Sequence, residues 1–487
     1  MSEKSIKVNS ILNVLKTLSS IIFPLITFPY ISRVLQPENV GKVNFGSSFV
    51  SYFSLIASLG ITTYAIRECS AVRGDKKKLG EKASQIFSIN VCTTIVAYVL
   101  LGLSLIFFRK LDSYRTLIII QSTAILFTTW GADWLNSAME DFKFITIRSI
   151  GFQFISLILM FILVHQPEDY LKYAAITVLS SCGANITNIL YRRKYCTVRF
   201  TKDMHWQEHF TSILLLFVMI LVQNIFSNAD TTMLGLMKGD FEVGIYSTAH
   251  KMKNIIVQVV ASLCWVVMPR MSYYFAEGDW NKINAMLKKI LSVMVTIGFP
   301  CVAGCVALSS EIIQIVAGQQ YSAASLPLVI LMVSFIVDIF GGSFLGNMVC
   351  LPAKQEKVFM EACCFAAVVN VVLNYILIPY GGASAVAFTS GISAIVICVW
   401  LFVKKDKRVK LNYIGEVCKS PLIGSIIIII FCTAIKAVVA NIFAKLSICI
   451  LSSVILYFLT LILFHNVLVI DVCEAINNKI KKRKFPN

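Results

Sequence analysis

The sequence predicts an all-α polytopic membrane protein of about fourteen transmembrane helices, arranged as two pseudo-symmetric six-helix bundles followed by two further helices. Three observations predict it: an apolar composition, a series of long apolar stretches, and an uneven distribution of Lys and Arg. Of the 487 residues, 57% are apolar and 14% are charged, and the mean hydropathy is +0.77. Soluble domains are about 45–50% apolar and about 25% charged. This composition therefore excludes an ordinary soluble enzyme.

Each predicted span is an apolar stretch near the roughly 20 residues that a helix needs to cross the hydrocarbon. In chain order they cover residues 10–33, 43–66, 84–108, 116–137, 146–165, 172–191, 211–236, 243–269, 290–317, 326–350, 358–379, 383–403, 420–439 and 447–469. Some are uniformly apolar, such as the span containing Ser425–Phe431. Others carry frequent small and polar residues, as in Asn44–Ser58. We expect these mixed spans to line a polar cavity or to pack closely against other helices.

The Lys and Arg residues indicate the orientation of the spans. With a cytoplasmic N-terminus, the segments on the inside hold about 32 of the 44 cations and those on the outside about 7, a bias typical of cytoplasmic loops. Both termini are therefore predicted to be cytoplasmic. The net charge of +18 is mainly a topology signal that meets anionic lipid headgroups, so we expect no nucleic-acid partner.

An internal repeat relates the two predicted bundles. Val40-Gly41 opens the second span and Val243-Gly244 opens the eighth, and each copy continues to a basic loop with Gly-Asp, at Gly74-Asp75 and Gly278-Asp279. We expect three regions: an N-terminal bundle at 1–203, a second bundle at 204–405, and two additional helices with a basic tail at 406–487. Parallel repeats with a cleft between them suit alternating access.

The sequence offers no chemistry for a cofactor or a metal. Its fifteen Cys are scattered through apolar runs without metal-type spacing, which is typical of small packing residues. It has no Gly-rich phosphate loop, and we expect neither a cofactor nor ATP hydrolysis.

Charges inside the spans are the candidate functional residues, because a charge near the bilayer centre is costly. Asp230 lies at a depth similar to Lys251, so the two can pair across a hairpin or neutralise each other structurally. Lys253 then has no obvious acid and is a candidate for an anionic ligand. Asp338 is the most central acid and is a candidate proton or ion site, or a structural hydrogen-bonding group.

Four further cations lie in or beside spans. Lys16 and Arg33 are candidates to bind an anionic head group, although either can instead extend to an interface. We expect Lys436 to extend to the outer interface and Arg148 to be a topology anchor at an inner span end. A cavity with more cations than acids favours a substrate that carries phosphate or diphosphate.

Several segments carry a family resemblance, which extends over about residues 10–405. They are Phe23–Gly41, Tyr52–Leu55, Leu59–Ile61, Asp133–Leu135, Glu140–Lys143, Ile145–Arg148, Asp230–Gly235, Val243–Ser247, Asn370–Pro379 and Gly381–Ala383. The chain resembles Wzx-type O-antigen and capsule flippases, in the polysaccharide transporter branch of the multidrug/oligosaccharidyl-lipid/polysaccharide exporter superfamily. Arg33, Asp133 and Trp134 lie in matched motifs, whereas Lys16, Lys253 and Asp338 rest on depth and charge alone.

The resemblance implies a bacterial plasma-membrane transporter that moves undecaprenyl-diphosphate-linked oligosaccharide units to the outer leaflet, coupled to an ion gradient. It implies a cationic cavity and a polysaccharide polymerase and chain-length regulator as candidate protein partners. Members have about twelve to fourteen spans, which leaves the last two spans open.

Three other functions fit parts of the sequence. A drug or small-cation exporter of the same superfamily would need acids facing the cavity, especially in the first span, where this chain has Lys16 and Arg33. A membrane polymerase or glycosyltransferase would need a large outside loop or an acidic motif, and Glu168-Asp169 is the only acidic pair in the longest outside loops. A nonenzymatic scaffold is the third.

Overall fold

The computed structural model describes residues 3–464, 466 and 468. Its helices also contain positions whose side chains are not described, namely 3–18, 20, 21, 208, 210–212, 215, 216, 218, 219, 222, 223, 226, 227, 263, 265 and 266. All regular elements in the described residues are helices, which confirms the predicted fold class.

Contacts divide the chain into two units, residues 1–244 and 245–487. The predicted regions 1–203, 204–405 and 406–487 describe a sequence repeat and stay a prediction. Unit 1 contains α1 (Glu3–Ser58), α2 (Ile61–Ala71), α3 (Lys76–Phe107), η1 (Arg109–Tyr114), α4 (Arg115–Gly131), α5 (Trp134–Ala138), α6 (Phe142–Leu163), η2 (Pro167–Asp169), α7 (Tyr170–Cys182), α8 (Ala184–Tyr191), η3 (Arg192–Lys194) and α9 (Trp206–Lys238).

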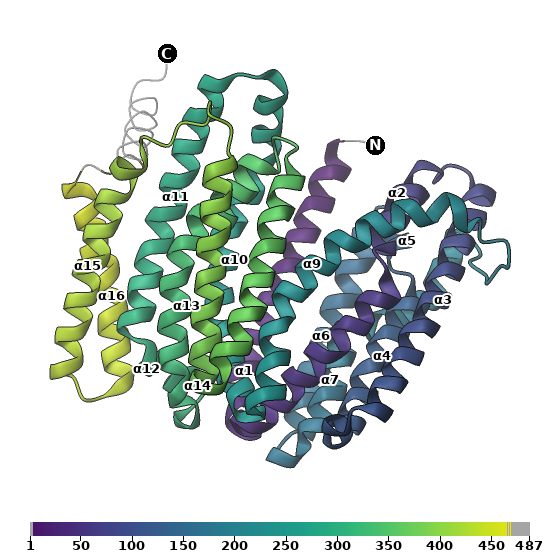
Figure 1. Cartoon of the computed structure of the whole chain (residues 1–487), viewed down its shortest axis with the longest axis horizontal. Coiled ribbons are helices and arrows are strands. Elements are labelled where there is room, and N and C mark those ends of the chain that lie inside the picture. Colours follow the sequence, from purple (N-terminus) through teal and green to yellow (C-terminus); the bar gives the residue numbers. More distant parts are fainter. Residues whose placement is uncertain (1–2, 465, 467, 469–487) are drawn as a thin grey trace. The chain divides into compact units, whose positions relative to one another are not determined.

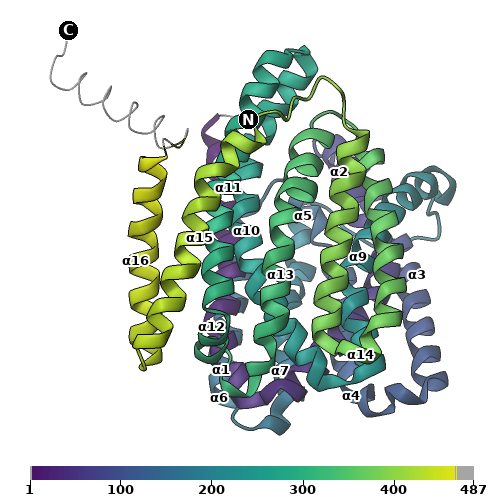
Figure 2. The ribbon, with the colours of Figure 1, turned by 60° about the vertical axis from the view of Figure 1, so that its left-hand side comes forward.

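Unit 2 begins within α10. Its elements are α10 (Asp240–Glu277), α11 (Trp280–Ala307), α12 (Ser309–Val316), η4 (Gln319–Ala324), α13 (Ser325–Asp338), the π-helix η5 (Ile339–Cys350), α14 (Glu356–Lys404), α15 (Ile414–Val438) and α16 (Ile442–Leu463). The last two helices are antiparallel neighbours, drawn in yellow in Figure 2, and α15 also packs along α11.

Two long helices each contain a chain reversal. In α1 the reversal is at Gln36, whose φ of 64° is left-handed and which precedes Pro37, a residue that disfavours helix before it. In α14 it is at Gly382, with φ of 50°, three residues after Pro379. The purple ribbon of Figure 1 follows the first reversal. Each of these helices therefore contains two predicted spans.

Eight segments of the described chain are long and apolar enough to cross a membrane, and the bent helix α10 would make a ninth. Two of the eight, 22–71 and 356–404, contain the reversals. Other predicted spans are divided into shorter helices. The span predicted at 116–137, for example, is α4 and α5 with a break at Ala132, where φ is 46°.

The loops predicted on the same side of the membrane meet within each unit. In unit 1, Arg73 pairs with Glu140 at 2.7 Å, so the loops before α3 and α6 meet at one end. At the other end, Tyr30 donates to the Val164 carbonyl at 2.7 Å. In unit 2, Lys288 and Glu416 pair at 2.9 Å and join two loops predicted to be cytoplasmic. This grouping agrees with the predicted topology of the loops.

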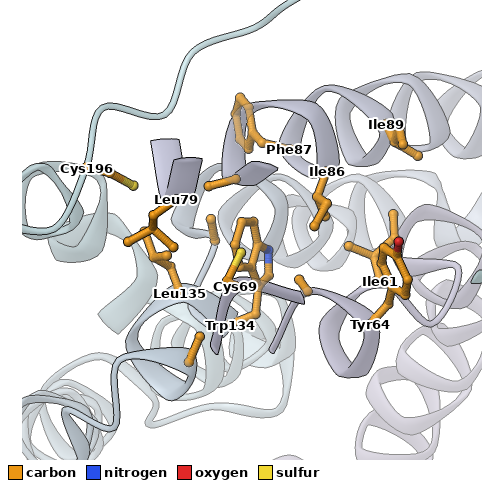
Figure 3. Packing of buried hydrophobic residues seen from close by; sticks show 14 of the residues in the cluster. Ile61, Tyr64, Cys69, Leu79, Ile86, Phe87, Ile89, Trp134, Leu135 and Cys196 are labelled. Carbon is orange, nitrogen blue, oxygen red and sulfur yellow. The ribbon is translucent and has the colours of Figure 1, made fainter. Parts of the chain in front are cut away.

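A hydrophobic cluster supports the basic end of unit 1 (Figure 3). It contains Trp134 and Leu135 from α5, packed with side chains of α2 and α3. Cys196, from the loop that follows η3, also belongs to it. The cluster fixes the short helix α5 in place, and with it the turn that carries Asp133.

The repeat motifs have matching local structures. Asp75 and Asp279 are the N-caps of α3 and α11, where their carboxylates accept hydrogen bonds from backbone N–H groups of the first turn. Gly41 and Gly244 lie at a close backbone crossing in unit 1. A Cβ on Gly41 would overlap the Asp240 carbonyl, and one on Gly244 would overlap the Pro37 carbonyl. Close backbone packing therefore explains why a glycine stands at each of these two positions.

Candidate functional site

Two of the predicted site residues, Asp338 and Lys253, act on each other electrostatically within unit 2. Asp338 is the last residue of α13 and is half-buried, and the chain continues directly into the π-helix η5. Lys253, on α10, lies within electrostatic range of this carboxylate. Depth along the spans offers Lys253 no obvious acid, because Asp338 comes from a helix about 85 residues away in sequence, beyond the hairpin neighbours that depth alone can compare. The assignment of Lys253 to an anionic ligand stays a prediction.

Glycines let the carboxylate of Asp338 lie against backbone. Ser343 Oγ donates to Asp338 Oδ2 at 3.5 Å, across the first turn of η5. A Cβ on Gly342 would lie 2.9 Å from Asp338 Oδ1, and one on Gly341 would lie 2.9 Å from the Cα of Cys398 on α14. Widened helical turns of this kind are frequent at functional sites.

Lys251 lies one turn from a packed aromatic group. His250 stacks on Tyr246 with ring centroids 5.6 Å apart, and the Tyr246 hydroxyl lies 3.4 Å from Ser390 Oγ on α14. Lys251 is half-buried. It belongs to unit 2 and Asp230 to unit 1, so their predicted pairing stays a prediction.

Asp230 is buried within a polar contact between α1 and α9. Ser48 Oγ lies 2.8 Å from Thr232 Oγ1, and the Tyr52 hydroxyl donates to the same Thr232 oxygen at 3.3 Å. Asp230 acts electrostatically on Tyr52. The polar residues that made the second and seventh spans the least apolar therefore meet each other, as mixed spans are expected to do.

Arg33 and Lys16 are the two predicted site cations of the first span, and both lie on α1. Arg33 is exposed, and its Nη1 donates to the Pro29 carbonyl at 3.4 Å. Lys16 lies on α1, but its side chain is outside the described residues. The structure brings neither of them to Asp338 or Lys253 within one unit, because both belong to unit 1.

Asp133 and Trp134 have structural partners. Asp133 Oδ1 accepts hydrogen bonds from Arg148 Nη2 and from Asn136 Nδ2, the latter at 3.0 Å. Arg148 is 7% exposed and also donates to the Ala184 carbonyl at 3.1 Å. The expectation that Arg148 is a topology anchor at the interface is therefore wrong: it is a buried ion-pair partner. Trp134 is 4% exposed and belongs to the cluster of Figure 3.

A buried polar network, not anticipated from the sequence, joins the two halves of α14. Asn374 Nδ2 donates to Asn370 Oδ1 at 3.1 Å, and Thr389 Oγ1 from the second half donates to Asn374 Oδ1. Ser393, one turn further, bonds the Thr389 carbonyl at 2.9 Å. The signal that could have found it is the spacing of Asn370 and Asn374, which places two amides on one helix face.

An apolar groove of about 750 Å³ was also missed. It lies in unit 2 between α11, α15 and α16. Pro300, Gly304 and Cys305 line it from α11, and Val454 and Phe458 from α16. Gly304 leaves open space there, since a Cβ on it would meet no atom within 4 Å. A uniformly apolar span gives no sequence signal for a groove, because its apolar pattern is the same whether lipid or a ligand covers it.

Glu311 ties the last two helices to the rest of unit 2. Its carboxylate lies 2.9 Å from Lys436 Nζ on α15 and 3.7 Å from Lys445 Nζ on α16, and Lys436 also donates to the Ala307 carbonyl at 2.8 Å. Lys436 thus pairs with a buried acid, a contact that its position along the span did not indicate, and its extension to the outer interface stays a prediction. These ion pairs of Glu311 hold α15 and α16, the two helices that close the groove, against the rest of unit 2.

Two family models match the chain. One, described as "Polysaccharide biosynthesis protein", matches residues 6–275, and the other, described as "Lipid II flippase MurJ", matches residues 255–469. The chain is 22% identical over 374 residues to a Shigella dysenteriae protein named "Putative O-antigen transporter", covering 74% of this chain and 90% of that protein. It is 23% identical over 384 residues to the capsular polysaccharide biosynthesis protein CapF of Staphylococcus aureus, covering 75% and 90%.

Solved structures show the same fold. The lipid II flippase MurJ in an inward closed conformation superposes with a TM-score of 0.76 at 15% identity, covering 95% of this chain and 99% of that one. An inward-facing multidrug resistance transporter of the MATE family superposes with a TM-score of 0.58 at 13% identity, covering 78% and 94%. The chain is a multi-pass membrane protein with this helical fold.

Proposed function

The chain belongs to the polysaccharide biosynthesis protein family, and from this we propose that it is a flippase for undecaprenyl-diphosphate-linked oligosaccharide units. It moves them from the inner to the outer leaflet of the bacterial plasma membrane, by alternating access, for O-antigen, capsule or exopolysaccharide synthesis. It is a transporter and forms no covalent intermediate with its substrate.

The apolar groove of unit 2 is the observation that carries this proposal. The substrate has a polar head that cannot enter hydrocarbon and a long polyprenyl tail that must stay in it. Lipid tails are as apolar as the groove, so the groove supplies a shaped path and close packing instead of a hydrophobic driving force. Its residues Val454 and Phe458 are exposed on α16, so the groove is continuous with a lipid-facing surface.

The cations within the spans serve the diphosphate. Lysine and arginine are its usual protein partners, and Arg33, Lys16, Lys251 and Lys253 are the residues we assign to it. Asp338 and Asp230 are the acids we assign to ion coupling. For Asp338 the nearby Lys253 makes the two roles interdependent, because a cation that leaves the diphosphate can return to the carboxylate.

Both termini face the cytoplasm in this proposal, and the protein lies in the plasma membrane. The grouping of basic loops at one end of each unit supports that orientation. A polysaccharide polymerase and a chain-length regulator are the protein partners we expect. The drug-exporter alternative is disfavoured by the first span, which carries Lys16 and Arg33 and no acid.

The groove gives a direct test of this function. Gly304→Leu points a side chain into the groove, and its Cβ would meet no atom within 4 Å, so we expect the variant to fold but to lose most of its flipping activity. Gly102→Leu is the matched control, because Gly102 is a helical glycine of α3 with the same open surroundings and lies in unit 1. Surface polysaccharide in a strain deleted for this gene, complemented by each variant at equal protein level, is the measurement. Full surface polysaccharide with Gly304→Leu would contradict the role of the groove.

A further inference from the structure

A polar cavity of about 440 Å³ lies within unit 1, apart from the groove. It lies between the second half of α1 and helices α2, α3, α4, α5, α7 and α8. Six of its lining residues carry polar or thiol side chains from five different elements or their caps, namely Ser54, Thr62, Asp133, Ser137, Cys182 and Asn185. Ligand pockets in proteins are typically about 300–1,000 Å³, so the cavity is large enough for a small ligand.

The lining offers unused hydrogen-bonding groups. Ser54, Thr62, Ser137 and Asn185 have no side-chain hydrogen bond within the part of the chain that the structure describes. All but Thr62 are half-buried. Polar groups that leave bulk water without a partner are costly, so convergent groups of this kind are typical of sites that a polar ligand or water completes.

Charge limits which ligand fits. Of the lining residues that the structure describes, Asp133 alone carries a carboxylate, and Arg148 and Asn136 both bind its Oδ1. Its Oδ2 has no hydrogen bond among the described residues and can accept one. Because Arg148 compensates the carboxylate and no Lys or Arg lines the cavity among the described residues, the site suits an uncharged ligand with several hydroxyl groups and suits neither a diphosphate nor a free cation.

The cavity is open to the outside of unit 1. Thr62 and Thr128 on its rim are exposed, whereas Asn90, Thr129 and Trp134 are buried at its base. The base is held by the hydrogen bonds of Asn90 to the Ala57 carbonyl at 2.8 Å and of Thr129 to Thr94 at 2.8 Å. A ligand can therefore reach the Thr62 hydroxyl at the rim, above a base that is fixed by hydrogen bonds.

We propose that this cavity is a binding site for a neutral sugar residue of the transported oligosaccharide. The proposal rests on the flippase function and adds to it a saccharide subsite in unit 1. Ser54, Thr62, Ser137 and Asn185 bind sugar hydroxyls, and Asp133 Oδ2 accepts one further hydroxyl. Neutral sugars are recognised in this way by a few convergent hydroxyl, amide and carboxylate groups.

Cys182 provides the test, because its thiol lines the cavity and is half-buried. The full chain in lipid nanodiscs is alkylated with iodoacetamide, and the modified cysteines are followed by peptide mass spectrometry. N-acetylglucosamine, galactose and rhamnose are the separate probes, and inorganic phosphate is the charged control. Cys92, half-buried on α3 and outside the cavity, is the internal reference.

We expect at least one sugar to slow the alkylation of Cys182 but not of Cys92, and phosphate to slow neither. Thr62→Ala and Asn185→Ala should each weaken the apparent affinity of that sugar about 2- to 12-fold, the change that one lost hydrogen bond produces. Thr63→Ala, the exposed neighbour that does not line the cavity, should have no effect. Asn185→Ala keeps the Cβ that faces Gly131, where an added Cβ would lie only 2.5 Å from it, and thermal unfolding of each variant checks that it folds.

Three results would overturn the sugar site: no protection by any sugar, equal protection by phosphate, or protection unchanged in both lining variants. The flipping of lipid-linked oligosaccharide, measured on the same nanodisc-derived protein after reconstitution in liposomes, separates the two proposals. Flipping without sugar protection removes the subsite alone, whereas sugar protection without flipping removes the flippase function and leaves a saccharide-binding cavity.

Discussion

Asp338 and Lys253 are coupled by charge in the interior of unit 2. Removing one member leaves the other without its counter-charge, whereas removing both does not. We therefore expect a double-mutant cycle of Asp338→Asn and Lys253→Met to show a coupling energy of about 0.5–3 kcal/mol. The free energy of unfolding of the four proteins, measured in the same detergent, gives that energy. A cycle in which the two single effects simply add would contradict the pairing.

Asp141, at the N-cap of α6, predicts a pH dependence at the loop end of unit 1. Burial raises the pKa of its carboxyl, but hydrogen bonds from Tyr195 and Tyr191, the Phe144 N–H and the Lys194 charge outweigh burial and lower this pKa below its usual value. A depressed pKa in the folded state means that the stabilisation is present above the unfolded-state pKa of about 3.9 and is lost as the pH falls through the folded-state pKa.

Asp141→Asn should therefore lower the stability at neutral pH by about 1–2 kcal/mol and should flatten the loss of stability below about pH 4. Thermal unfolding between neutral and acid pH measures both effects. Lys143→Met, an exposed change in the first turn of α6, is the control. Parallel pH curves for the Asn variant and the unmodified chain would rule out this role of Asp141.

Among individual residues, the sequence located the cations and acids of the spans but not their partners. Asp338 and Asp230 were recognised because an acid in an apolar stretch is unusual. The sequence did not indicate that Asp133 pairs with Arg148 or that Lys436 pairs with Glu311, since each contact joins different helices. Depth along one span orders charges along the membrane normal and says nothing about which helices are neighbours.

Among the elements, the glycine crossing of unit 1 is the clearest link between the repeat and the fold. Gly41 and Gly244 stand at equivalent repeat positions, and each lies against the backbone of the other copy. Gly41→Ala and Gly244→Ala must shift backbone, so we expect each to cost about 1–3 kcal/mol of stability. Gly102→Ala, in open surroundings, should be neutral or slightly stabilising. Equal unfolding temperatures for all three variants would contradict the crossing.

Helix positions followed from the sequence better than helix breaks did. Within the described residues, the predicted spans lie mainly on helices, because a 20-residue apolar stretch has few alternatives in a membrane; residues 465, 467 and 469 of the last span lie outside the described residues. The division of the span at 116–137 depends on Ala132, an ordinary helix former that takes a left-handed φ of 46° because Asp133 and Trp134 are held by Arg148 and the hydrophobic cluster. The helix propensity of Ala132 cannot predict this break, because its cause is the tertiary contacts of the two residues that follow.

For the whole molecule, composition and charge predicted a polytopic membrane protein, and the family and fold comparisons agree. The groove at the last two helices was not predicted, because the internal sequence repeat ends before α15 and α16 and leaves them outside both predicted bundles. From the position of the groove, we propose that these two helices hold the lipid tail of the substrate while the rest of the chain moves its polar head group.

Reconstituted flipping tests the central claim most directly. The purified full chain is placed in sealed liposomes that contain undecaprenyl-diphosphate-linked oligosaccharide, and a membrane-impermeant glycosidase reports how much substrate has an outward-facing sugar. We expect the protein to expose the protected inner-leaflet half of the substrate, and Gly304→Leu to leave that half protected while Gly102→Leu behaves as the unmodified chain. Continued protection of the inner-leaflet substrate in the presence of folded, unmodified protein and an ion gradient of either direction would contradict the flippase function.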